Sequence, residues 1–167
     1  MNHRAFTLIE ILVVLAVIGT LAGIGIPVTR SVIRKSRQAA CLNQLRSLGV
    51  GLESYLQEHN QIMPDLEAGR ASKTEDVPVL DTVLLPYLET ADAFHCPEDR
   101  EQFAKSGSSY SWNSLVSGKR LSDAFVFGIS EDRIPLILDK ESWHPDGVNF
   151  LYPDMSSSNK PRFAAGN

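Results

Sequence analysis

The sequence predicts an α+β protein in which one long N-terminal helix packs on a small head with an antiparallel β-sheet. Three observations support this prediction. The chain begins with an apolar stretch, continues with apolar residues at three- and four-residue spacing, and ends with short apolar runs between turn residues. With 167 residues, of which 43% are hydrophobic, the chain has room for one membrane segment and one modest domain.

The first element is an uncharged apolar segment, residues 11–28. Its length is that of a helix crossing a hydrocarbon core about 30 Å thick. Glu10 stands directly before it, and Arg4 lies in a short polar leader. A secretory signal peptide has a basic charged region and a small-residue cleavage site after the apolar segment, so the acidic residue favours another kind of signal. Cleavage by ordinary signal peptidase after residues 20–22, giving a secreted protein that starts at Gly23, remains an alternative.

We expect the helix to continue through Pro27, which removes one backbone hydrogen bond, and to end near Glu58, with Asn60 and Pro64 as stop signals. Beyond Pro27 the apolar residues form one stripe, interpreted as the surface on which the head packs. The stripe comprises Val28, Val32, Ala39, Leu42, Leu45, Leu48, Leu52, Tyr55 and Leu56. The polar residues that fall mainly elsewhere are Arg30, Arg34, Arg37, Gln38, Gln44 and Ser47.

The remaining chain predicts short elements. We expect a surface loop over residues 62–79 and a short helix, Thr82–Leu88, capped by Asp81. The expected strands are Ser109–Trp112, Leu136–Asp139 and Val148–Tyr152, the last two forming a hairpin around residues 144–147. The tail, residues 156–160, is expected to be a loop, with Phe163 docking back onto the head.

The segment Ala5-Phe6-Thr7-Leu8-Ile9-Glu10, followed by apolar residues, resembles the type III signal of type IV prepilins and type II secretion pseudopilins. The resemblance implies that a prepilin peptidase cleaves between Ala5 and Phe6 and that Phe6 is then N-methylated. Ala5 stands where the family has Gly, so we expect slower processing. Pro27 matches a proline that many of these proteins carry in the same helix.

The resemblance also implies a role for Glu10, which would pair with the terminal amine of a neighbouring subunit during filament assembly. An ionised carboxylate in the apolar core costs about 2.5–3.5 kcal/mol and is retained mainly where it finds a partner. The alternative is that Glu10 lies at the level of the lipid headgroups and needs no partner.

The expected organisation follows from this resemblance. It comprises a leader (1–5), a transmembrane or filament-core helix (6–28), an amphipathic helix (29–60) and a globular head (61–167). The function implied is that of a structural subunit, major or minor, of a type II secretion pseudopilus or a type IV pilus. The alternative is a secreted or membrane-anchored binding protein that does not polymerise.

The implied location is the bacterial inner membrane, crossed once, with the head in the periplasm or outside the cell. The implied partners are the prepilin peptidase, copies of the chain itself, other pilin-like subunits and the inner-membrane assembly platform. The positive-inside rule alone gives the opposite orientation, because more positive charges follow the apolar segment than precede it. Those that follow are Arg30, Arg34, Lys35 and Arg37.

A second resemblance lies in the head. The segment from Cys41 to Gly49 and the segment Phe94-His95-Cys96-Pro97 are similar to motifs of the H-X9-DG pilin-like family. His144, Gly147, Asn149 and Asp154 match its terminal motif, in which Met155 replaces a glycine. If that glycine supports a turn with positive φ, Met155 is expected to adopt another turn type.

The two cysteines, Cys41 and Cys96, are too far apart for a CxxC pattern. In an oxidising periplasm a disulfide is their natural pairing, and two free buried thiols are the alternative. Calcium binding by His144, Asp146 and Asp154 is an alternative, but Asp139, Asp146 and Asp154 are too scattered for the dense acidic loop that calcium prefers. We therefore expect structural hydrogen bonding at these residues, no metal and no cofactor. No nucleophile motif such as GxSxG is present, and we expect no enzyme. An anchored hydrolase or sensor remains a further alternative.

The charge distribution is uneven. Residues 1–61 hold six Lys/Arg against three Asp/Glu, a net charge of +3, whereas residues 62–167 hold ten against seventeen, a net charge of −7. Phosphate recognition relies on basic patches, so the acidic head is not expected to bind nucleic acid.

Overall fold

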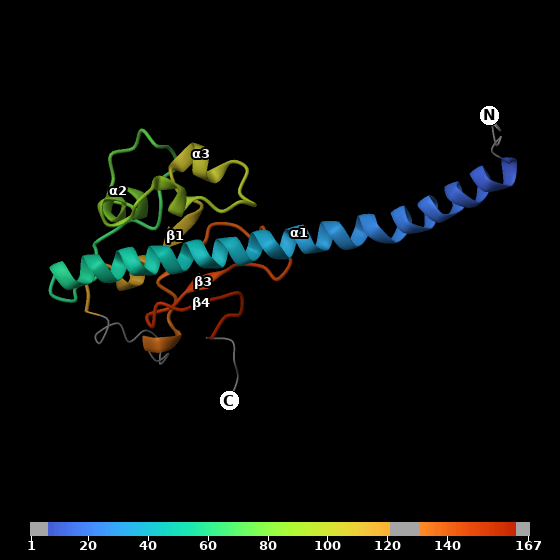
Figure 1. The fold of residues 1–167 in the computed structure, drawn as a ribbon. Helices are drawn as coiled ribbons and strands as arrows, with labels where there is room; N and C mark the ends of the chain where they lie inside the picture. The colour runs from blue at the N-terminus through green and yellow to red at the C-terminus, as the bar shows by residue number, and fades with distance from the viewer. Residues whose placement is uncertain (1–6, 121–130, 163–167) are drawn as a thin grey trace. The chain divides into compact units, whose positions relative to one another are not determined.

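The computed structural model describes residues 7–120 and 131–162, and at positions 25, 27 and 131 it describes the backbone alone. The chain divides into two compact units, Met1–Ser36 and Arg37–Asn167, which are described separately. Helix α1 (Leu8–Glu58) belongs to both (Figure 1). The expected long helix and its end at Glu58 are therefore confirmed.

In the first unit, α1 presents large apolar side chains to its surroundings over its whole length. Leu8 is 85% exposed, Leu21 67% and Ile33 45%. The helix is long and apolar enough to cross a membrane, a property that a signal sequence shares. The helix continues past Pro27, as predicted.

In the second unit, α1 buries one face. Cys41, Leu45, Leu48 and Leu52 are fully buried, and Leu56 nearly so. The predicted stripe is therefore correct from Leu45 onward. Of its earlier members, Val28, Val32 and Ala39 are exposed and Leu42 is half-buried. Gln38, expected on the polar side of the wheel, is also buried.

Two glycines of α1 allow close packing on different sides of the helix. A Cβ atom on Gly49 would lie 3.2 Å from the Leu151 side chain, and one on Gly51 would lie 2.9 Å from Leu88. Residues two apart on a helix point about 200° away from each other. Gly49 therefore admits strand β3 and Gly51 admits the segment after α2, which offsets the low helix propensity of glycine.

After α1, Asn60 and Gln61 adopt positive φ angles of 55° and 62°, which turn the chain away from the helix axis. The helices and 3-10 turns that follow are α2 (Leu80–Leu84), η1 (Leu85–Tyr87), η2 (Ala91–Phe94), α3 (Gln102–Ser106), η3 (Ser114–Val116) and η5 (Glu131–Arg133). The strands are β1 (Tyr110–Trp112), β2 (Ile137–Asp139), β3 (Phe150–Leu151) and β4 (Ser157–Ser158).

Within the described residues, the four strands form one antiparallel sheet in the order β1-β2-β3-β4. Trp112 pairs with Ile137, and Ile137 pairs with Leu151, so fully buried side chains line up across the three predicted strands. The expectation of a loop for the tail was wrong, because Ser157 pairs with Leu151 as part of β4. The two serines of β4 have no apolar side chains from which a strand could be predicted. They form a strand by pairing with the edge of β3. Phe163 lies outside the described residues.

The expectation that Asp81 caps the short helix was wrong. The Thr82 hydroxyl accepts the Val79 backbone N–H at 3.0 Å, and α2 begins at Leu80. The Asp81 carboxylate instead binds the Arg70 guanidinium in a largely buried ion pair. Arg70 also donates from Nε to the Ser106 carbonyl, so this pair joins the loop before α2 to the end of α3.

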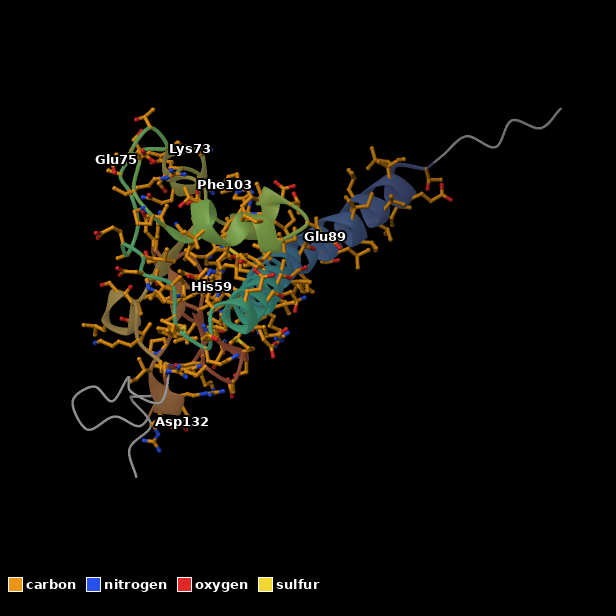
Figure 2. All side chains as sticks on the ribbon, turned by 90° about the vertical axis from the view of Figure 1, so that its left-hand side faces the viewer. His59, Lys73, Glu75, Glu89, Phe103 and Asp132 are labelled. Atoms are coloured by element: carbon orange, nitrogen blue, oxygen red, sulfur yellow. A yellow bond between two sulfur atoms is a disulfide. The ribbon has the colours of Figure 1, made fainter. Side chains whose placement is uncertain are left out.

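The Phe103 ring of α3 contacts two other segments of the head. Lys73 lies over the ring of Phe103, with its Nζ 5.0 Å from the ring centroid (Figure 2). The His95 ring stacks on Phe103 at a centroid distance of 4.6 Å. These contacts hold the loop around residue 73 and the segment before Cys96 against α3.

Candidate functional site

The N-terminal candidate is the first turn of α1, where Glu10 folds back onto Thr7. One Glu10 carboxylate oxygen accepts hydrogen bonds from the Thr7 backbone N–H at 2.8 Å and from its hydroxyl at 2.9 Å. The Thr7 hydroxyl in turn accepts the Glu10 N–H at 3.4 Å. This reciprocal arrangement is a capping box. It directs the carboxylate toward the N-terminal end of the helix, where the helix dipole favours negative charge.

The predicted cleavage bond between Ala5 and Phe6 lies outside the described residues. Pro27 lies within α1, but its ring is also outside the described part of the chain. The roles assigned to these three residues therefore stay predictions.

The candidate site in the head is built around the Cys41–Cys96 disulfide, the expected pairing. Cys41 lies on α1 and Cys96 follows η2, and their Cα atoms are 5.1 Å apart. A hydrogen-bond relay fixes the second cysteine: its N–H donates to the Ser109 hydroxyl at 2.9 Å, which donates to Asp99 at 2.6 Å. The bond therefore connects α1 to the start of β1 through a buried, hydrogen-bonded loop.

His144 completes this cluster. Its Nε2 lies 3.4 Å from the Cys96 sulfur and 3.5 Å from Oδ2 of Asp139, which ends β2. Both side chains are wholly buried. His144 is brought here by the turn between β2 and β3, where it forms an isolated bridge with Gly147. Gly147 has φ +97°, a conformation that glycine adopts without strain.

Burial disfavours charge on both groups. It raises the pKa of Asp139 to about 7, although hydrogen bonds from Asn149 act in the opposite direction. Burial also lowers the pKa of His144, against the negative charge of Glu98. Both shifts favour the neutral forms, as expected for ionisable groups removed from water.

Asn149 and Gln38 extend the cluster through hydrogen bonds. The Asn149 backbone N–H donates to Asp139 Oδ2 at 2.8 Å, and the Gln38 amide donates to the Asn149 side-chain oxygen at 3.4 Å. Several buried atoms here have no hydrogen-bond partner among the described residues. They are Glu98 Oε1, Asp139 Oδ1, His144 Nδ1 and Asn149 Nδ2. Such groups are rare in folded proteins, and their concentration marks this place as unusual.

Asp154, the aspartate that ends the H-X9-D part of the head motif, lies in a different environment. It accepts hydrogen bonds from Ser156 at 2.6 Å and from Arg162 at 2.9 Å on the surface. Met155 adopts φ +56°, so the expectation that it would take another turn type was wrong. Its side chain is partly buried against the core.

Sequence reasoning missed Gln38 and the contact of Asp139 with His144. The adjacent Asp-Lys pair at the end of a buried strand was the available signal for Asp139, whereas the position of Gln38 on the helix wheel indicated a polar face. The T-x-x-E spacing of Thr7 and Glu10 was a readable capping-box signal.

Comparison with known proteins gives one family match. Residues 1–26 match the prokaryotic N-terminal methylation motif. This motif is the prepilin-type cleavage and methylation signal, so the first resemblance is confirmed. No curated protein and no solved structure matches the chain. The resemblance of the head to the H-X9-DG family stays a prediction.

The signal supports a type IV pilin-like or pseudopilin-type protein, and it points to a structural subunit rather than an enzyme. The long helix and the four-stranded antiparallel sheet are consistent with the α+β pilin-like fold. The signal implies processing by a prepilin peptidase and assembly with pilin-like subunits. Together with the apolar helix, it fits a protein anchored in the inner membrane.

Proposed function

We propose that this protein is a subunit, major or minor, of a type II secretion pseudopilus or a type IV pilus. The peptidase cuts between Ala5 and Phe6 and Phe6 is methylated. The apolar part of α1 then moves from the membrane into a filament, with the head in the periplasm or outside the cell. The observation that carries this proposal is the prepilin-type signal at the start of a helix with exposed apolar side chains.

The exposed side chains of the first unit support assembly. The large apolar residues from Leu8 to Ile33 are 45–85% exposed on all sides of the helix. A soluble monomer rarely exposes so large a continuous apolar surface, so lipid or other helices must cover it. A filament core of bundled helices provides such a cover after the subunit leaves the membrane.

Glu10 supports the proposed mechanism of assembly. Its carboxylate reaches back to the Thr7 N–H, and cleavage would place the new amine of Phe6 one residue before Thr7. The carboxylate therefore already points to the end of the helix that a neighbouring amine would approach. Pairing of the two charges would set the stagger between subunits.

The first experiment determines the mass of the N-terminal peptide of the protein purified from membranes of its own host. We expect a peptide that begins with methylated Phe6. A peptide that begins at Gly23 would indicate an ordinary secreted protein. An intact Met1 would indicate a plain membrane anchor and would refute the filament proposal.

The second experiment separates capping from charge pairing at Glu10. A Glu10→Gln variant keeps the length and hydrogen-bonding capacity needed for a capping box but loses the charge. We expect both Glu10→Gln and Glu10→Ala to be cleaved normally and to be incorporated into filaments at least tenfold less, measured in sheared filament fractions. Glu53→Ala, an exposed acid on the same helix, is the control and should assemble normally. Normal incorporation of Glu10→Gln would reject the charge-pairing mechanism.

A further inference from the structure

The buried cluster at the disulfide contains four groups that bind transition metals. Two are the sulfur atoms of Cys41 and Cys96, and the others are the imidazole of His144 and the carboxylate of Asp139. The ligand atoms of the two cysteines and the histidine lie within 4.8 Å of one another, and all three residues are buried. We propose that the reduced form of this protein binds one zinc ion between these four side chains.

The distances within the cluster support this proposal. In tetrahedral zinc sites the Zn–S distance is about 2.3 Å and the Zn–N and Zn–O distances about 2.0–2.2 Å, so neighbouring ligand atoms lie about 3.3–3.8 Å apart. His144 Nε2 lies 3.4 Å from the Cys96 sulfur and 3.5 Å from Asp139 Oδ2. These two separations already match those of a zinc site. The two sulfur atoms are the pair that must separate, and breaking their bond makes them separate.

The surroundings also support it. Asp139 and His144 have wholly buried side chains, and their facing atoms, Oδ2 and Nε2, are the ones that would bind the metal. Asn149 holds Asp139 Oδ2 through its backbone N–H at 2.8 Å. This is the kind of outer hydrogen bond that orients a ligating carboxylate.

Metal binding and the disulfide exclude each other. A thiol reductant converts the disulfide to two thiols, supplying two electrons and two protons, and is itself oxidised to a disulfide. Zinc then displaces the two thiol protons and binds the thiolates. The oxidised protein should therefore bind no metal at this place. This proposal does not depend on filament assembly.

The test uses the full-length protein in detergent, reduced with a phosphine so that no thiol reagent competes for the metal. Cobalt(II) serves as the spectroscopic probe for zinc. We expect the reduced protein to bind one cobalt per chain with thiolate-to-cobalt absorption bands, and we expect zinc to displace the cobalt. The oxidised protein should show no such bands. Absence of the bands in the reduced protein, whether or not it is folded, would overturn the proposal.

Variants identify the ligands. His144→Gln and Asp139→Asn should each weaken cobalt binding at least tenfold, whereas His95→Gln should bind as the wild type does. His95 is the matched control because it precedes Cys96 but its ring contacts the Asp99 carbonyl and Phe103 instead. Unchanged binding by His144→Gln would contradict the proposal. If that variant does not fold, X-ray absorption of the zinc-loaded wild type decides, and must show two sulfur ligands and at least one imidazole.

Discussion

At the scale of single residues, Asp99 connects three segments of the head. It accepts the backbone N–H groups of Glu101, Gln102 and Phe103 at 2.7–2.9 Å and the hydroxyl of Ser109 at 2.6 Å. Burial tends to raise the pKa of Asp99, but these four hydrogen bonds together lower it below its usual value. The ionised carboxylate is therefore the form that the folded head stabilises.

This lowered pKa predicts loss of stability in acid. Since the folded-state pKa lies below the unfolded value near 3.8, the contribution is complete above that value and disappears as pH falls through the folded-state pKa. We expect Asp99→Asn to be less stable at pH 7, by about 1–3 kcal/mol, and to lose less stability than the wild type between pH 5 and pH 2. Denaturant unfolding across this range measures the effect. Parallel curves for the two proteins would contradict it.

Gly107 illustrates a second constraint on a single residue. It ends α3 with φ +91°, and a Cβ atom there would meet the buried ion pair of Arg70 and Asp81. We expect Gly107→Ala to lower the free energy of unfolding by about 2–4 kcal/mol, combining backbone strain and overpacking.

The matched control is Gly118→Ala. Gly118 has φ +65°, but a Cβ atom there would have its nearest neighbour 4.0 Å away. This variant should show the backbone strain alone, about 1 kcal/mol. If the two variants lose equal stability, as measured by denaturant unfolding, the ion pair does not constrain Gly107.

The residues of the candidate site were predictable only in part. Cys41, Cys96, His144 and Asn149 stood out through local motifs, and the structure gathers all four. Gln38 joins them through its hydrogen bond to Asn149, and Asp139 through its contact with His144. The Gln38 contact joins segments more than a hundred residues apart, which leaves no local pattern in the sequence. Asp154 was grouped with His144 by spacing, yet its partners are Ser156 and Arg162.

At the scale of elements, the part of α1 in the second unit packs its apolar face into the core of the head. Leu48 is fully buried, whereas Val50, two positions further along the same helix, is 61% exposed. We expect Leu48→Ala to cost about 2–5 kcal/mol of stability because it leaves a cavity in the core. Val50→Ala, the control, should change stability by less than about 0.5 kcal/mol. Comparable losses in chemical denaturation would show that the buried stripe is not the main packing surface.

The helices and strands also differ in how well the sequence pattern predicts their positions. The helix and the first three strands carry periodic apolar residues, so their positions were predicted to within a few residues. Strand β4 consists of two serines and depends on the neighbouring edge of β3. Helix α2 begins two residues before the predicted Thr82, because Thr82 rather than Asp81 supplies the hydrogen bond at its start. It ends at Leu84 instead of Leu88, and the 3-10 turn η1 continues the chain to Tyr87.

At the scale of the whole molecule, the disulfide is the main covalent constraint on the head. It closes a separation of 55 residues, for which the chain-entropy model gives a stabilisation of about 4 kcal/mol. We expect the Cys41→Ser, Cys96→Ser double variant to lose about 2–4 kcal/mol in denaturant unfolding with a metal chelator present. A loss below about 1 kcal/mol would mean that the closed segment retains structure when unfolded.

The position of this bond also determines how the head would carry load. Cys41 lies four residues after the second unit begins at Arg37. Tension that enters the head along α1 passes from Cys41 directly to Cys96 and then toward the C-terminus. The segment between the cysteines, whose contour length is about 190 Å when extended, lies outside this path. Tension applied along this path would therefore not stretch the segment while the bond is intact.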